Sequence, residues 1–99
     1  MRNYEVIYII KTSVDTEQIP AVVEKYKQLL ESNGGEIVKI EEWGKRRLAY
    51  EVNKNREGYY VLMNVKSSTS ACQELERILK IDEVILKYLI IRLEEEKVS

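Results

Sequence analysis

Apolar and polar residues alternate along the chain with two different periods, and the first segment has a period of two. Residues 3–10 combine β-branched and aromatic side chains, and Tyr4, Val6, Tyr8 and Ile10 occupy every second position. Such alternation is typical of a strand with one buried face. We therefore expect a first strand here, with these four side chains pointing toward the core.

Residues 15–33 change to helical spacing. Asp15 or Thr16 can cap this helix, and Pro20 falls near its first turn, where a missing N–H costs little. The "NGG" at 33–35 is typical of a helix end. The apolar stripe of the expected helix consists of Ile19, Val22, Val23, Tyr26, Leu29 and Leu30.

Residues 36–52 form the longest run with strand character. Ile37 and Ile40 both favour burial although they are three positions apart, which suggests a bulge near Gly44. Simple alternation places Arg46, Leu48 and Tyr50 on the core-facing side of the strand, with Lys45, Arg47 and Ala49 on the other side. The alternative is that the bulge at Gly44 turns Arg46 outward. At ~3.3 Å per residue this strand is longer than its neighbours, so part of it must project past the sheet.

The second half of the chain repeats the order of strand, helix and strand. Residues 53–58 predict a turn and residues 59–66 a third strand. The "SSTS" at 67–70 offers several helix caps, and residues 84–93 predict a last strand. The helix between them carries Cys72, Leu75, Ile78 and Leu79.

The order β-α-β-β-α-β is that of the split βαβ, or ferredoxin-like, fold of the α+β class. Right-handed crossovers then give a four-stranded antiparallel sheet in the order 4-1-3-2, with both helices on one face. We expect one domain over residues 1–93 and a short charged tail over residues 94–99.

The opposite, open face of this sheet is expected to be apolar. If the even-numbered residues of the first strand face the helices, strand parity places large side chains on the uncovered side. A wet sheet face normally carries polar residues, so this pattern favours a surface for a protein partner. The alternatives are that the tail folds over this face or that the parity is wrong in one strand. The residues concerned are Ile7, Ile9, Tyr60, Leu62, Leu89 and Ile91.

Composition restricts the function further. The 99 residues contain no histidine and a single cysteine, Cys72, so we expect a buried structural thiol, no metal, no cofactor and no enzymatic activity. No apolar stretch approaches the ~20 residues of a membrane span, and we expect a soluble intracellular protein. The net charge of −1 argues against a nonspecific polyanion binder, so any contact with nucleic acid must be local. The run Lys45, Arg46 and Arg47 is such a local concentration of positive charge.

Two other functional classes share this topology. RNA-recognition motifs stack bases on exposed aromatics, and "REGYYVLM" at 56–63 is loosely similar to their basic-Gly-aromatic run. However, the first strand offers Ile7 and Ile9 rather than a stacking ring, so the open face suits protein better than bases. A small-molecule or acyl-phosphate domain would need a glycine-rich loop after the first strand, and "KTSVDT" at 11–16 has no glycine.

Several segments resemble the small-subunit ribosomal protein six family of bacteria and organelles. They are "MRNYEV" at the start, "GKRRLAYEV" at 44–52, "EGYYVL" after the turn, and the apolar end of the chain before its tail. The resemblance spans residues 2–93 and implies a noncatalytic component of the ribosomal platform. It also implies binding to small-subunit (16S) rRNA together with ribosomal protein eighteen, in the cytoplasm or in the plastid stroma.

Five positions match the pattern of this family: Arg2, Tyr4, Arg46, Arg47 and Arg92. For the four arginines, the resemblance implies a role in RNA binding. For Tyr4 the parity of the first strand favours a core position instead. The first and last strands are antiparallel neighbours, so Arg2 and Arg92 should meet at one edge, where two guanidinium groups can grip a phosphate or a base edge.

Each arginine pair also has a purely structural interpretation. Arg2 and Arg92 can be ordinary solvated side chains paired with Glu5 or Glu94, and the run at 45–47 can balance Glu42 or Glu57. A net charge of −1 provides little attraction toward RNA over long distances. We therefore expect weak RNA binding by the isolated protein and stronger binding by the heterodimer.

Overall fold

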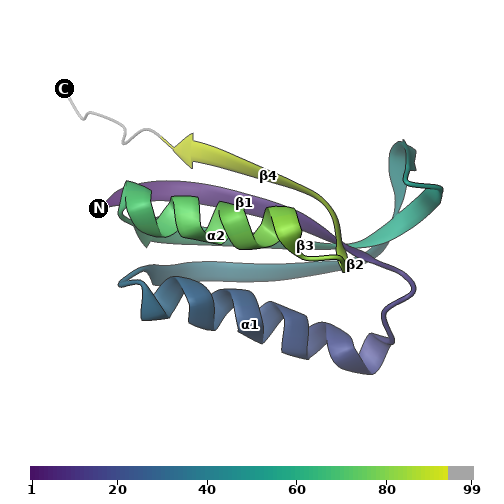
Figure 1. Cartoon of the computed structure of the whole chain (residues 1–99), viewed down its shortest axis with the longest axis horizontal. Helices are drawn as coiled ribbons and strands as arrows, with labels where there is room; N and C mark the ends of the chain where they lie inside the picture. The colour runs from purple at the N-terminus through teal and green to yellow at the C-terminus, as the bar shows by residue number, and fades with distance from the viewer. Residues whose placement is uncertain (94–99) are drawn as a thin grey trace.

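A computed structural model describes residues 1–93 as a sheet with two helices (Figure 1). The tail predicted at 94–99 lies outside the described residues. The elements are β1 (Arg2–Lys11), a short 3-10 turn (Thr16–Gln18), α1 (Ile19–Ser32), β2 (Glu36–Val52), β3 (Asn55–Ser67), α2 (Thr69–Ile81) and β4 (Ile85–Leu93).

The four strands are antiparallel in the order β2-β3-β1-β4, which confirms the predicted topology. Both helices cover the same face of this sheet (Figure 1). The side chains of β1 that were expected to face the helices are buried there, and Tyr4 is one of them, with 6% of its surface exposed. The main core consists of Tyr4, Val6, Tyr8, Ile10, Ile19, Val23, Tyr26, Leu30, Val61, Met63, Val65, Cys72, Leu75 and Leu79.

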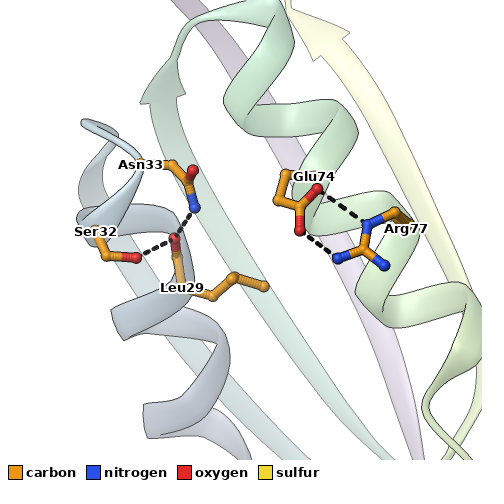
Figure 2. Close-up of polar contacts among 5 residues, drawn as sticks. All are labelled: Leu29, Ser32, Asn33, Glu74 and Arg77. Carbon is orange, nitrogen blue, oxygen red and sulfur yellow. Dashed lines mark hydrogen bonds and ion pairs between the residues drawn. The ribbon is translucent and has the colours of Figure 1, made fainter.

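Helix α1 begins later than the capping pattern suggested. Asp15 makes no side-chain capping bond and precedes the short 3-10 turn, whereas Pro20 lies in the first turn of α1 as predicted. At the other end, Ser32 Oγ and Asn33 Nδ2 donate to the Leu29 carbonyl at 3.0 and 2.8 Å (Figure 2). These bonds satisfy a carbonyl that the helix end leaves without an intrahelical donor.

Helix α2 has a side-chain cap at its start. Ser68 Oγ accepts a hydrogen bond from the Ala71 amide at 3.1 Å, which selects Ser68 among the caps offered by 67–70. On the exposed surface of α2, the Arg77 guanidinium donates twice to the Glu74 carboxylate, at 2.6 and 3.0 Å (Figure 2).

Asp82, just after α2, ties that helix to α1. Its carboxylate accepts hydrogen bonds from the Tyr26 hydroxyl at 2.5 Å, from Lys25 Nζ at 2.9 Å and from the Val84 amide at 3.1 Å. Burial opposes ionisation of Asp82, but these three donors together outweigh it and hold the pKa of the carboxyl below its ordinary value. The anchor is therefore an ionised carboxylate at neutral pH.

The Tyr8 ring packs beside Tyr26, with ring centroids 5.1 Å apart. Within residues 1–93, its buried hydroxyl has no hydrogen-bond partner. Burial, with a smaller contribution from the charge of Glu42, raises the pKa of Tyr8, so the hydroxyl stays neutral.

The turn between β2 and β3 is shorter than the predicted six residues. Asn53 and Lys54 alone form it, with φ of +47° and +65°, and β3 begins at Asn55. Two consecutive positive φ values are typical of the tight type I′ hairpin turn. The prediction missed it because this turn is usually recognised by a glycine, and here a lysine adopts the left-handed conformation.

Strand β2 contains the predicted bulge near Gly44 and another at Val38, the extra residue that lets Ile37 and Ile40 both face the core. Glu42 is paired with Val61 and Gly44 with Tyr60, so Trp43 is the extra residue, and Gly44 has φ of +82°. One extra residue inverts the alternation that follows. Arg46, Leu48 and Tyr50 consequently lie on the open side of the sheet, not on the core-facing side that simple alternation predicted.

Candidate RNA-binding and protein-binding surfaces

The six apolar residues predicted for the open face do share one face. Ile7 is paired with both Leu62 and Leu89, Ile9 with Tyr60, and Ile91 with Glu5 on the same side. The parity chosen for β1, β3 and β4 is therefore confirmed. Leu89 and Ile91 are 52% and 39% exposed, and they form an apolar strip along β4.

The expectation that all six are uncovered is wrong for Ile9 and Leu62, which are only 6% and 7% exposed. For Ile9 the physical reason is the projecting end of the β2–β3 hairpin, which bends away from the plane of the sheet (Figure 1). Its Leu48 packs with Ile9 and Leu86 in a small second core. An aspartate at Ile9 or Leu62 would therefore disturb the fold as well as the face.

An apolar hollow of about 190 Å³ remains beneath this hairpin. At its rim, Lys87 lies 4.7 Å from the centre of the Tyr50 ring and donates a hydrogen bond to the Tyr50 hydroxyl. The lining includes Ile7, Ile9, Leu48, Val52, Tyr60 and Leu89.

Gly58 is what allows the hairpin to bend closely over the sheet. A Cβ atom on Gly58 would lie 2.3 Å from Ile9 Cγ2 and 3.3 Å from the Ile10 carbonyl oxygen. The absence of a side chain here thus permits Ile9 to pack beneath β3.

The four arginines predicted to bind RNA fall into two groups at opposite ends of β1. Arg92 is paired with Tyr4, and Arg2 lies two residues before Tyr4 on the same side of the strand. The prediction that these two residues lie near each other at one end of the sheet is therefore confirmed, and both side chains are exposed.

At the other end, the structure separates Arg46 from Arg47. Arg46 is paired with Gly58 on the open side, and Arg47 is paired with Glu57 on the other side. Lys45 Nζ lies 3.7 Å from the Glu57 carboxylate, so the charge of Lys45 is balanced by Glu57, as the structural interpretation of this run predicted.

The sequence interpretation missed Trp43, which organises this end of the open face. The Trp43 and Tyr60 rings are stacked, with centroids 6.3 Å apart and planes inclined by 14°. The Arg46 guanidinium lies 5.3 Å from the centre of the Trp43 ring. Trp43 is the only tryptophan of the chain and directly precedes the bulge glycine, Gly44. This position in the sequence could have identified Trp43 as a candidate site residue.

Glu41 fixes the other edge of the indole. Trp43 Nε1 donates to its carboxylate at 3.1 Å, and Lys39 Nζ lies 2.8 Å from the same carboxylate. Hydrogen bonds from Lys39 and then Trp43 lower the pKa of Glu41. Glu41 is therefore charged at neutral pH and already paired.

The remaining chemistry of the described chain is sparse. Cys72 is buried as expected, and burial, followed by the charge of Glu76, raises the pKa of its thiol. Within residues 1–93, acidic and cysteine side chains form no cluster suited to a metal ion. In the same part of the chain, no helix has the length and apolar character to cross a membrane.

Comparisons with known proteins agree along almost the whole chain. The sequence model of the family described as Ribosomal protein S6 matches residues 3–92. Small ribosomal subunit protein bS6 of Moorella thermoacetica is 52% identical over 96 residues, which cover 97% of this chain and 98% of the relative. The bS6 protein of Desulforamulus reducens is 52% identical over 92 residues, which cover 93% of this chain and 97% of the relative.

A solved structure shows the same likeness in three dimensions. The crystal structure of 30S ribosomal protein S6 from Thermotoga maritima matches with a TM-score of 0.89 at 32% sequence identity. The match covers 93% of this chain and 87% of that one.

Proposed function

The chain belongs to the ribosomal protein S6 family, and from this premise we propose that it binds small-subunit rRNA in the ribosomal platform as a heterodimer with ribosomal protein eighteen. It is a structural, non-enzymatic protein of the small ribosomal subunit. Its place of action is the ribosome, in the cytoplasm. The proposal concerns what the protein contacts there and through which surfaces.

The observation that carries the proposal is the exposed apolar strip of β4. Leu89, Ile91 and Leu93 are 52%, 39% and 39% exposed and lie on the side of the sheet that no helix covers. Exposed leucine and isoleucine in neighbouring rows of a sheet are typical of a protein contact. We assign this strip, together with Ile7 and Tyr60 beside it and the buried Ile9 and Leu62 beneath, to the face that binds the protein mate.

The arginines supply the proposed RNA contacts. Arg2 and Arg92 lie at one end of the sheet, with Arg46 and Arg47 at the other end, and all four are exposed. Few phosphates can be neutralised by so few cations in a chain of net charge −1, so binding by this protein alone should be weak. The mate is expected to supply much of the remaining positive charge.

Filter binding to a 16S rRNA transcript at physiological salt tests the proposal. We expect low retention of the RNA by the isolated protein and high retention by the heterodimer. Equal affinity with and without ribosomal protein eighteen would contradict it.

A pair of matched variants tests the face. Leu89→Asp places a charge on the apolar strip at an exposed position, so we expect loss of co-purification with the mate and an unchanged fold. Ile81→Asp is the control, because Ile81 is 63% exposed at the end of α2, away from the strip. Unchanged co-purification of Leu89→Asp, or equal loss in both variants, would show that the strip is not the contact.

A further inference from the structure

On the open side of the sheet, Tyr60 and Arg46 both lie against the Trp43 ring, and we call these three residues the aromatic–arginine stack. Tyr60 comes from β3, and the other two come from β2 on either side of the Gly44 bulge. The bulge places Trp43 next to Tyr60 and turns Arg46 to the same side. Stacking on an indole restricts the rotamers of the arginine, so its guanidinium is held in place before any ligand arrives.

Two lysines accompany Arg46 on this side. Arg46, Gly58 and Lys11 form one row across β2, β3 and β1, which places the Arg46 and Lys11 Cα atoms ~10 Å apart at the usual strand spacing. Lys87 belongs to the adjacent row, where it is paired with Ile9. Three of the four strands, β2, β1 and β4, thus each contribute one cation at the hairpin end of the face.

The other basic residues on the open side have acidic neighbours. Lys39 forms an ion pair with Glu41, and Lys66 is paired in register with Glu36. By contrast, across residues 1–93 no carboxylate lies within ion-pair distance of Arg46, Lys11 or Lys87. Within residues 1–93, Arg46, Lys11 and Lys87 at the hairpin end therefore have no acidic partner, either in an ion pair or in register.

We propose that the aromatic–arginine stack, with Lys11 and Lys87, is a binding site for the phosphate backbone of rRNA in which Trp43 positions Arg46. This inference rests on the proposed function and extends it, because it adds Lys11 and Lys87 to the RNA contacts, gives Trp43 a positioning role and distinguishes Arg46 from Arg47. Unbalanced cations from three strands suit a polyanion, whereas the apolar strip further along β4 suits the protein mate. RNA and mate then occupy adjacent parts of one face, and the two parts meet at Tyr60.

The test measures 16S rRNA binding by the preformed heterodimer over a range of salt concentrations. Arg46→Ala should weaken binding about tenfold and reduce the dependence of log K on log salt by roughly one phosphate contact, ~0.7 to 0.9. Trp43→Leu should weaken binding several-fold although it removes no charge. Trp43→Phe, which keeps a ring beneath the guanidinium, should restore most of the affinity.

Double variants separate a positioning role from a general structural one. In an Arg46→Ala background, Trp43→Leu should cost little more, because the residue that it positions is gone. In an Arg47→Ala background, Trp43→Leu should keep its full effect. Arg77→Ala, which removes one positive charge from the surface of α2, should leave RNA binding unchanged.

The outcomes are distinguishable from those of the proposed function. If the wild-type heterodimer fails to retain the RNA, the proposed function is wrong, and this inference with it. If the wild type binds but Trp43→Leu binds equally well, or loses affinity to the same extent in both backgrounds, the inference alone is overturned. It is also overturned if Trp43→Leu and Arg46→Ala weaken binding of the protein mate and leave RNA binding by the formed heterodimer intact.

Discussion

Two tyrosines with adjacent rings should respond in opposite directions to the same chemical change. Tyr8 and Tyr26 pack with ring centroids 5.1 Å apart in the main core, and the substitution Tyr→Phe removes one hydroxyl from each. The Tyr26 hydroxyl donates to the Asp82 carboxylate, whereas the Tyr8 hydroxyl has no partner within residues 1–93. Each variant is therefore a matched control for the other.

Tyr26→Phe should lower the free energy of unfolding. A hydrogen bond to a charged acceptor contributes ~1.5 to 3 kcal/mol, and we expect about 1.5 kcal/mol because Lys25 and the Val84 amide still hold Asp82. For a domain of this size, each kcal/mol changes the melting temperature by ~4 to 8 °C, so a decrease of roughly 6 to 12 °C should follow.

Tyr8→Phe should raise the free energy of unfolding, or leave it unchanged. An unsatisfied buried donor costs ~1 to 3 kcal/mol, and removing the hydroxyl recovers part of that cost, about 1 kcal/mol. The aromatic ring and its packing on Tyr26 are retained.

The effect of Tyr26→Phe should also depend on pH. The pKa of Asp82 is lowered in the folded protein, so its stabilising contribution is present above the unfolded value of ~3.9 and is lost as the pH falls through the folded pKa. Urea unfolding followed by circular dichroism, near neutral pH and well below ~3.9, measures the difference. A Tyr26→Phe effect that is equal at both pH values, or a Tyr8→Phe loss as large as that of Tyr26→Phe, would refute the reasoning.

Two further substitutions test the hairpin and the cap of α2. Gly58→Ala should lower the free energy of unfolding by about 2 kcal/mol, because its Cβ would lie 2.3 Å from Ile9 Cγ2 and overpacking of this kind costs ~1 to 3 kcal/mol. An unchanged denaturation midpoint would contradict this packing. Ser68→Ala should cost about 1 kcal/mol in the same assay by removing the bond that the Ala71 amide donates, and a loss below a few tenths would show that the cap contributes little.

The strand alternation of the sequence was sufficient for most of the fold. In β1, β3 and β4 each residue is paired without interruption over the central rows, so counting by two places Ile7, Leu62 and Leu89 on one face correctly. In β2 the count fails at two extra residues, Val38 and then Trp43. Gly44 indicated where a bulge lies, but only the pairing with β3 shows that one residue is inserted there and that the following side chains exchange faces.

The candidate site was harder to predict because it depends on curvature. Burial of Ile9 results from the hairpin bending over the sheet, and that bend depends on Gly58, whose role is a close contact with a residue 49 positions earlier in the chain. Likewise, the contribution of Trp43 depends on its neighbours Tyr60 and Arg46, which a one-dimensional pattern cannot place beside it. Arg46 and Arg47 were visible in the sequence as part of a basic run, whereas Arg2 and Arg92 were found from the resemblance.

The position of Trp43 has a practical consequence. It is the only tryptophan in the chain, it is 39% exposed, and its indole lies beside both a phenol ring and a guanidinium on the face assigned to both partners. Selective excitation of the indole would therefore report from a single point on that face. An unlabelled sample in a stopped-flow fluorimeter could then reveal the order in which protein mate and rRNA arrive, since each would change the surroundings of the same fluorophore.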